Sequence, residues 1–248
     1  MTYNKIGIFE FLAEPFHVDL SGHLTLGVIG NHLLNCAGMH ADQRGFGITQ
    51  LNKDNCTWVL SRIVFEFNQY PYQYEKFGIE TWVESVYKLF TNRNFALIGS
   101  DGTVMGYARS IWAMIDLNTR KPVDLLEMHN GRISEYVLPQ RECPIEGPSR
   151  IKVKAAEPVY TYTAKYSDID INKHFNSVRH IEHILDLFPI EKFCETKLQR
   201  FEIAFVNESH YGDTLEFYLD DNGDNKYSVE VRKKESGEVV CRSLVVFK

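Results

Sequence analysis

The spacing of hydrophobic residues predicts two helices, one in each half of the chain. In the first half, apolar residues recur every three or four positions after Leu26, which predicts an amphipathic helix over 26–43. The same spacing after Val178 predicts a helix over about 176–187, and Pro189 cannot continue it. Both stretches present polar residues on the opposite side, so each helix covers a core with one face.

Strand-like stretches with alternating or branched residues surround both helices. A short one, 8–18, opens the chain, and four follow each helix: 57–67, 77–84, 94–99 and 104–115 in the first half, and 198–206, 213–219, 226–233 and 239–247 in the second. The order predicts an α+β protein of two units. In each unit a long helix is wrapped by an antiparallel sheet, with the strands after the helix in a meander.

The two halves repeat one another in detail. Ala108-Arg-Ser in the last strand of the first half matches Cys241-Arg-Ser in the last strand of the second. We predict a first unit over 1–117, a polar linker with a short helix over 118–157, and a second unit over 158–248.

Candidate chemistry precedes the second helix, where Asp170, Asn172 and His174 occupy alternate positions. In an extended segment these side chains share one face, and the helix that follows offers free backbone N–H groups to a developing negative charge. Capping and turn formation are the ordinary roles of such residues, but three in phase favour a site. In the first half Asp19, Ser21 and His23 take the corresponding places, so the amide is missing there. The break after the first strand is Pro71 in the first half, where the second half has Glu208.

Composition excludes several classes of protein. The net charge of −6 leaves no basic stripe for nucleic acid, and no apolar run is long enough to span a membrane. Five cysteines without metal-like spacing, and a first segment without a targeting pattern, predict reduced thiols in a cytoplasmic protein. His180 and His183 are three apart, but His183 falls on the polar face of the helix. We therefore expect surface histidines there and no metal.

The chain resembles the plant and bacterial acyl-acyl carrier protein thioesterases. In the first half the resemblance rests on Asn31-His-Leu-Leu, Thr57-Trp-Val-Leu-Ser-Arg, Tyr70-Pro, Thr81-Trp-Val and Ala108-Arg-Ser-Ile-Trp-Ala-Met, and in the second on Ser167-Asp-Ile-Asp-Ile-Asn-Lys-His-Phe-Asn-Ser. It covers nearly the whole length. It implies a tandem (double) hotdog fold, with the acyl chain received by the first half and catalysis in the second.

By this resemblance Asp170, Asn172 and His174 fall on the catalytic Asp-x-Asn-x-His motif, and Glu208 falls on the downstream catalytic glutamate. Plant members commonly carry a cysteine directly after that glutamate, where this chain has Ser209. The departure argues against a cysteine nucleophile. Ser209 could support catalysis or act as the nucleophile, but the adjacent His210 should lie on the opposite strand face.

Thioester hydrolysis requires an activated water and a polarised carbonyl, and we expect no cofactor beyond the phosphopantetheine of the substrate. Glu208 and His174 are predicted to activate the water, the Asn172 amide and helix-start N–H groups to hold the oxyanion, and Asp170 to orient Asn172 or His174. Asp170 or Glu208 could equally be the base or attack directly.

Further candidates would serve binding. The side chains predicted to line an acyl pocket are Trp58, Phe65, Trp82 and Trp112, and those predicted to dock acyl carrier protein are Arg150, Lys152, Lys173 and Arg179. The function implied is hydrolysis of fatty acyl-acyl carrier protein by a monomer or homodimer. An acyl-coenzyme A thioesterase, a non-catalytic acyl-thioester-binding protein and, less favoured, a hotdog dehydratase are the alternatives.

Overall fold

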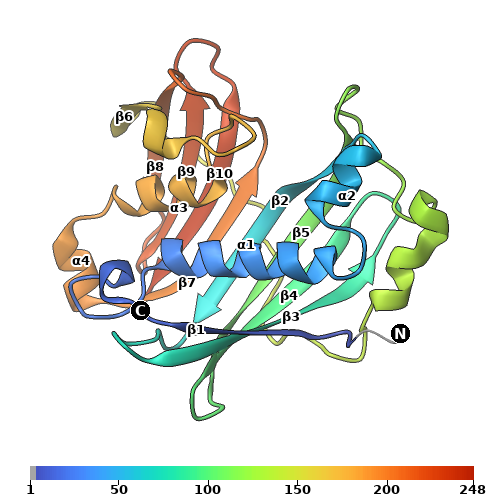
Figure 1. Cartoon of the computed structure of the whole chain (residues 1–248). Coiled ribbons are helices and arrows are strands. Elements are labelled where there is room, and N and C mark those ends of the chain that lie inside the picture. Colours follow the sequence, from blue (N-terminus) through green and yellow to red (C-terminus); the bar gives the residue numbers. More distant parts are fainter. Residues whose placement is uncertain (1–3) are drawn as a thin grey trace. The chain divides into compact units, whose positions relative to one another are not determined.

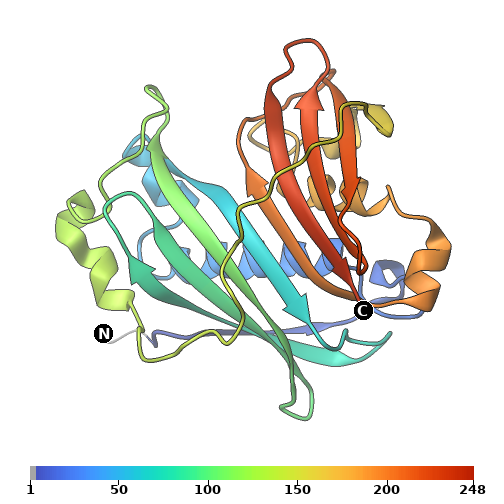
Figure 2. The same ribbon diagram turned by 180° about the vertical axis from the view of Figure 1, so that it is seen from behind.

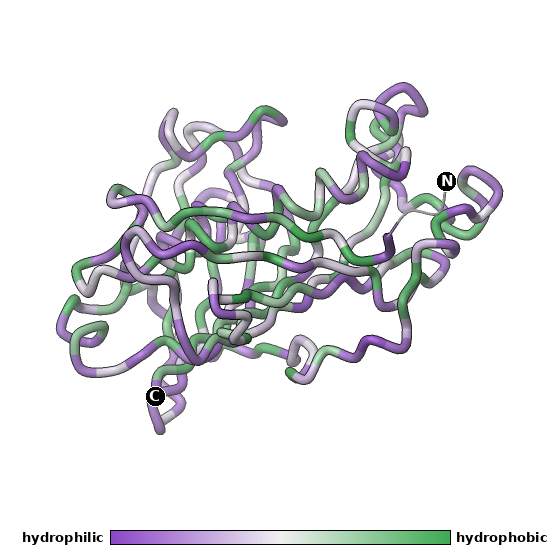
Figure 3. Tube along the Cα trace, turned by 60° about the horizontal axis from the view of Figure 1, so that its bottom comes forward, coloured by the Kyte–Doolittle hydropathy of each residue, from purple (hydrophilic) through white to green (hydrophobic). Residues whose placement is uncertain are grey.

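The computed structural model describes residues 4–248, so the first three residues of the predicted N-terminal unit lie outside it. The chain divides into two compact units between Gly147 and Pro148. Hydrophobic and hydrophilic stretches are interspersed along the whole chain, as Figure 3 shows. No helix within the described residues has both the length and the apolar character needed to cross a membrane.

The first unit is one antiparallel sheet with a long helix on one face (Figure 1). Its strands are β1 (Gly7–Leu12), β2 (Cys56–Phe67), β3 (Lys76–Val86), β4 (Thr91–Gly99) and β5 (Val104–Asp116), and its helices are α1 (Leu26–Asp42) and the short α2 (Ile48–Lys53). The strand order is β1-β3-β4-β5-β2. The predicted meander therefore holds only for β3 to β5, because β2 pairs with β5 instead of with β3.

Helix α1 begins and ends where its sequence allows. The Thr25 hydroxyl caps it by accepting a hydrogen bond from the Val28 N–H at 3.3 Å. Beyond its end, Gly45 takes a left-handed φ of 78°. Ile29 and Leu33 are completely buried on the side of the helix that faces the sheet, as the hydrophobic spacing predicted.

The second unit repeats this topology with a shorter helix. Its strands are β6 (Tyr160–Thr163), β7 (Leu198–Phe205), β8 (Thr214–Asp221), β9 (Lys226–Lys233) and β10 (Val239–Phe247), and its helices are α3 (Ser177–Leu185) and α4 (Ile190–Glu195). The order β6-β8-β9-β10-β7 matches that of the first unit strand for strand. Each unit is thus a hotdog, a helix laid against a curved antiparallel sheet.

The segment predicted as a linker packs against the first unit over much of its length. After a 3₁₀ helix, η2 (Met128–Tyr136), it crosses the face of the sheet opposite α1 (Figure 2). The buried side chains of Cys143 and Ile145 form a core cluster with Trp82 and Val64 on that face. The indole N–H of Trp82 donates to the Arg141 carbonyl at 2.8 Å.

Candidate active site

The Asp170–His174 segment is a tight turn, so the prediction of an extended segment with three side chains in phase is wrong. The Lys173 N–H donates to the Asp170 carbonyl at 3.0 Å, and the Asp170 N–H donates to the His174 carbonyl at 2.9 Å. Lys173 closes the turn with a left-handed φ of 66°. Polar residues at alternate positions suit both a strand face and a turn of this kind, and the period alone cannot separate them.

Asp170 organises the turn through its carboxylate. Its Oδ1 accepts hydrogen bonds from the backbone N–H groups of Asn172, at 2.8 Å, and His174, at 3.2 Å. The carboxylate therefore fixes the main chain of both residues. The Asn172 side chain is exposed at the tip of the turn. Asn176 caps α3 by accepting from the Val178 N–H at 2.8 Å, which occupies one of the helix-start donors predicted for the oxyanion.

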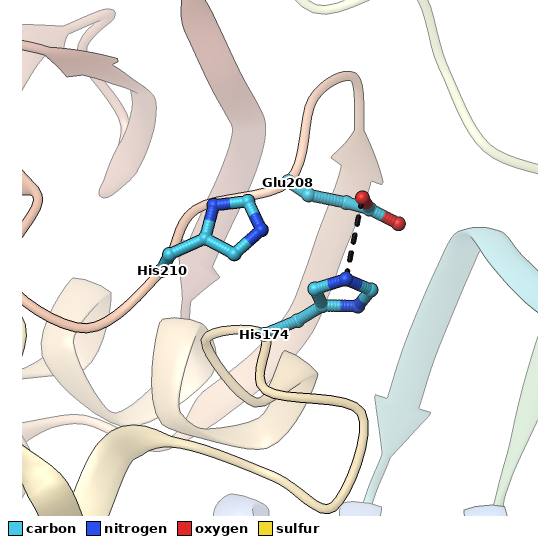
Figure 4. A group of neighbouring side chains, drawn as sticks. All are labelled: His174, Glu208 and His210. Atoms are coloured by element: carbon cyan, nitrogen blue, oxygen red, sulfur yellow. Dashed lines mark ion pairs between the residues drawn. The ribbon is translucent and has the colours of Figure 1, made fainter.

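His174 and Glu208 come together from segments far apart in the sequence. The His174 Nε2 lies 3.4 Å from a carboxylate oxygen of Glu208, and the two side chains point toward one another in Figure 4. A backbone bridge between His174 and His210 joins the turn to the segment after β7. Both partners are partly open to solvent, with 28% of the His174 side chain and 39% of the Glu208 side chain exposed. Water can reach the pair.

The residues after Glu208 alternate in direction as an extended segment should. Ser209 is buried, while Glu208 and His210 lie on the accessible side. The Ser209 hydroxyl has no hydrogen-bond partner among residues 4–248, so no base contacts it there. This geometry does not activate Ser209 as a nucleophile. His210, which the sequence did not indicate as a site residue, lies beside His174 with ring centroids 5.3 Å apart.

The same turn exists in the first unit with different chemistry. Asp19 Oδ1 accepts from the N–H groups of Ser21, at 2.8 Å, and His23, at 3.3 Å, as Asp170 does in the second unit. The His23 backbone bridges to Tyr72 where His174 bridges to His210. This register places Tyr70, and not Pro71 as predicted, at the position of Glu208.

His183 is not the surface histidine that the sequence predicted. Its ring nitrogen lies 3.3 Å from Asp168, and only 14% of its side chain is exposed. Asp168 is itself buried and also accepts from the Tyr162 hydroxyl at 2.9 Å and the Lys165 N–H at 2.8 Å. Burial alone would raise the pKa of Asp168, but these hydrogen bonds hold it below its usual value. His180 is buried as well, and burial lowers its pKa to about 3.

A cavity of about 200 Å³ opens between α1 and the sheet of the first unit. Trp58 and Trp112 line it, as predicted for an acyl pocket, together with Leu34, Ala37, Gly38, Ala41, Ile133 and Tyr136. Trp82 does not line it, because it packs on the opposite face of the sheet. Phe65 is buried but lies outside the lining. Arg44, Arg93 and Thr91 add polar groups to a mainly apolar wall.

The four cations predicted to dock a carrier protein are all exposed. Arg150 and Lys152 alternate with half-buried apolar residues ahead of β6, and Lys173 lies in the turn from Asp170 to His174. Arg179 is on α3, where its guanidinium pairs with Glu182 at 2.5 Å.

Comparison with known proteins connects this geometry to a family. Residues 10–129 match the model of the acyl-ACP thioesterase N-terminal domain, and residues 151–248 match that of the C-terminal domain. The chain belongs to the acyl-ACP thioesterase family. The crystal structure of an acyl-ACP thioesterase from Bacteroides thetaiotaomicron superposes with a TM-score of 0.92 at 60% identity, over 98% of both chains.

More distant members of the family share the fold. The 12:0-ACP thioesterase from Umbellularia californica superposes with a TM-score of 0.87 at 17% identity, over 99% of this chain and 98% of that one. The chloroplastic palmitoyl-acyl carrier protein thioesterase of Gossypium hirsutum is 24% identical over 95% of this chain, and oleoyl-acyl carrier protein thioesterase 1 of Arabidopsis thaliana is 26% identical over 84%. This chain spans 59% and 61% of the length of these two relatives.

Proposed function

We propose that the protein hydrolyses the thioester of fatty acyl-acyl carrier protein to a free fatty acid and the carrier protein. The observation that carries the proposal is the His174–Glu208 pair, an imidazole and a carboxylate 3.4 Å apart and open to water. Membership of the acyl-ACP thioesterase family supports it, as does an apolar cavity suited to an acyl chain in the first unit.

Glu208 acts as the general base in this proposal. Its carboxylate removes a proton from a water molecule that His174 helps to hold, and the water oxygen attacks the thioester carbon. The C–S bond then breaks, and the proton passes to the leaving thiolate, so that the products are a fatty acid and the free thiol of phosphopantetheine. No cofactor takes part.

Asp170 is a positioning residue, since one of its oxygens already accepts two backbone N–H groups and holds the turn closed. Because these hydrogen bonds tie that oxygen to the main chain, the carboxylate is poorly placed to serve as base or nucleophile. The Asn172 amide polarises the thioester carbonyl from the tip of the turn. A single donor of this kind contributes roughly 10²–10³ in rate.

Acyl chain and carrier are bound by different parts of the chain. The cavity lined by Trp58 and Trp112 receives the acyl chain, and the exposed cations at Arg150, Lys152, Lys173 and Arg179 attract an acidic carrier protein. In this proposal the reaction takes place in the cytoplasm. All five cysteines are unpaired, which suits a reducing compartment.

Thiol release from matched acyl-carrier and acyl-coenzyme A substrates tests the proposal. Because Cys194 is an exposed thiol, the Cys194→Ser variant is used so that Ellman's reagent reports only the product. We expect kcat/KM to be at least about tenfold higher for the carrier substrate, since docking cations add association rate. Equal or faster turnover of the coenzyme A thioester would indicate the alternative substrate, and binding without thiol release would indicate a non-catalytic protein.

A further inference from the structure

His174, Glu208 and His210 form a cluster of metal-ligating side chains at the proposed active site. One ligand atom from each lies within 4.8 Å of those of the other two. In Figure 4 the three side chains converge from two segments, the turn that ends at His174 and the extended segment that carries the other two. The proposed hydrolysis uses His174 and Glu208 but leaves His210 without a role.

The backbone holds this cluster together. The His174–His210 bridge places the two imidazoles side by side, and the Phe175 N–H donates to the Ser209 carbonyl at 2.7 Å to lock the register. Glu208 and His210 are two positions apart in an extended segment, so they share a face while Ser209 is buried between them. No long-range rearrangement is needed for all three to meet one ion.

Two imidazoles and a carboxylate are a ligand set that Zn²⁺ and its late first-row neighbours prefer. Ligand atoms around a tetrahedral Zn²⁺ lie about 3.4 Å apart, since each bond is about 2.0–2.2 Å long. His174 and Glu208 already meet that spacing at 3.4 Å. His210 must close by a small rotation, which its half-exposed side chain permits.

A second carboxylate fixes the main chain at His210. The Asp213 carboxylate lies 3.9 Å from the Nδ1 of His210 and accepts the backbone N–H of the same residue at 2.9 Å. Lys233 holds Asp213 at 3.2 Å from the other side. A slightly closer approach would let Nδ1–H donate to this carboxylate and leave Nε2 for an ion, which is the usual arrangement behind a metal-bound histidine.

The geometry points to a reversible binding site for a divalent transition-metal ion such as Zn²⁺ at His174, Glu208 and His210, occupancy of which inhibits hydrolysis. The inhibitory part rests on the proposed function. An ion there takes the lone pairs of both groups that would activate the water. The first unit supplies an internal contrast, because Tyr70 and Tyr72 hold the places of Glu208 and His210. One ion per chain is therefore expected.

The test measures binding of Zn²⁺ alone, by competition with a chromophoric chelator, and in parallel the hydrolysis of acyl-carrier substrate with and without Zn²⁺. All proteins carry Cys194→Ser to remove the exposed thiol as a zinc ligand. We expect one Zn²⁺ per chain and at least tenfold weaker binding in His210→Asn. The zinc concentration that halves the rate of hydrolysis should rise by the same factor in this variant. His210→Asn leaves zinc-free activity unchanged. Tyr72→Phe, at the matching place in the first unit, changes neither.

Equal zinc affinity in His210→Asn and the parent protein would overturn the site. Binding that depends on His210 but accelerates hydrolysis, or leaves it unchanged, would overturn the inhibitory role. Failure of the proposed function gives a different result, because zinc then binds through His210 in a protein that releases no thiol from acyl-carrier substrate.

Discussion

Tyr70 in the first unit occupies the position that Glu208 occupies in the second. The two residues are related by matching backbone contacts: the Leu24 N–H donates to the Pro71 carbonyl at 2.9 Å, as the Phe175 N–H does to that of Ser209. Both units therefore keep the turn, the histidine and the strand register. Only the second has a carboxylate at the point where the histidine faces it, and this difference assigns the proposed chemistry to that unit.

The duplicated turn permits a matched test of Asp170. Replacing Asp170 with Ala removes the acceptor for two backbone N–H groups and releases His174, so we expect activity to fall at least about tenfold, in line with the cost of small misplacements of catalytic groups. Asp19→Ala removes the same two bonds from the first unit. Both variants should lose about 1–2 kcal/mol in the free energy of unfolding. Chemical denaturation and thiol release measure the two effects, and an equal loss of activity in both variants would refute the positioning role.

Asn172 has an equally matched control in Ser21. Asn172→Ala removes the amide proposed to polarise the carbonyl, and kcat should fall by roughly 10²-fold with little change in KM. Ser21→Ala in the first unit should leave both parameters unchanged. If Asn172→Ala raised KM and left kcat intact, the amide would be a binding group and not a group that stabilises the transition state.

The cavity predicts how acyl-chain preference can be changed. Gly38 lines the cavity, and a Cβ added there meets no atom within 4 Å. Gly38→Leu therefore starts a side chain at the cavity wall from a Cβ that meets no neighbour, and we expect the preferred acyl chain to become shorter. Trp82→Phe is the control, since Trp82 packs on the opposite face of the sheet. A panel of acyl-carrier substrates of increasing length measures the preference, and an unchanged profile for Gly38→Leu would place the acyl chain elsewhere.

Two buried histidines predict acid sensitivity of the fold. Burial, and then the neighbouring His183, lowers the pKa of His180 to about 3, and burial with Arg93 and Arg44 lowers that of His40 to about 3. Both remain neutral in the folded protein at pH 5.5, whereas the unfolded chain protonates them below about 6.5. The unfolded state then binds more protons, so stability falls as the pH decreases from about 6.5 toward 3.

Urea denaturation at pH 7.5 and 5.5 measures this effect. The two histidines together should lower the free energy of unfolding by about 2–3 kcal/mol between these pH values. His180→Leu should remove about half of that difference. If the free energy of unfolding of His180→Leu had the same pH dependence as that of the parent protein, His180 would not resist protonation in the folded state.

Hydrophobic spacing predicted most of the fold. The bounds of β9 and β10 match the predicted strands at both ends, and those of α1 at its start, because each has a strong period and a clear start or stop residue. The short elements α2, α4 and β6 were missed, since four to six residues carry too little periodicity to stand out. Their formation depends on packing against the rest of their unit.

The site was predicted in its residues but not in its local shape. Asp170, Asn172 and His174 alternate as a strand would, yet the Asp170 carboxylate folds back on the backbone N–H groups of Asn172 and His174, a local turn that the alternation does not distinguish from a strand. The resemblance to a family supplied Glu208. Nothing in the sequence marks His210 as a site residue except its place two residues after that glutamate. It lies next to His174 because of a backbone bridge between residues 36 positions apart in the sequence.

The central claim is that Glu208 activates water beside His174, and single-turnover hydrolysis of an acyl-carrier substrate by Glu208→Gln tests it most directly. Gln keeps the size and a hydrogen-bonding oxygen but cannot accept the proton, so we predict a rate at least about 10²-fold below that of the parent protein with unchanged substrate affinity. The matched first-unit variant Tyr70→Phe should retain the parent rate. A Glu208→Gln protein that hydrolyses the substrate within a few-fold of the parent rate would contradict the account.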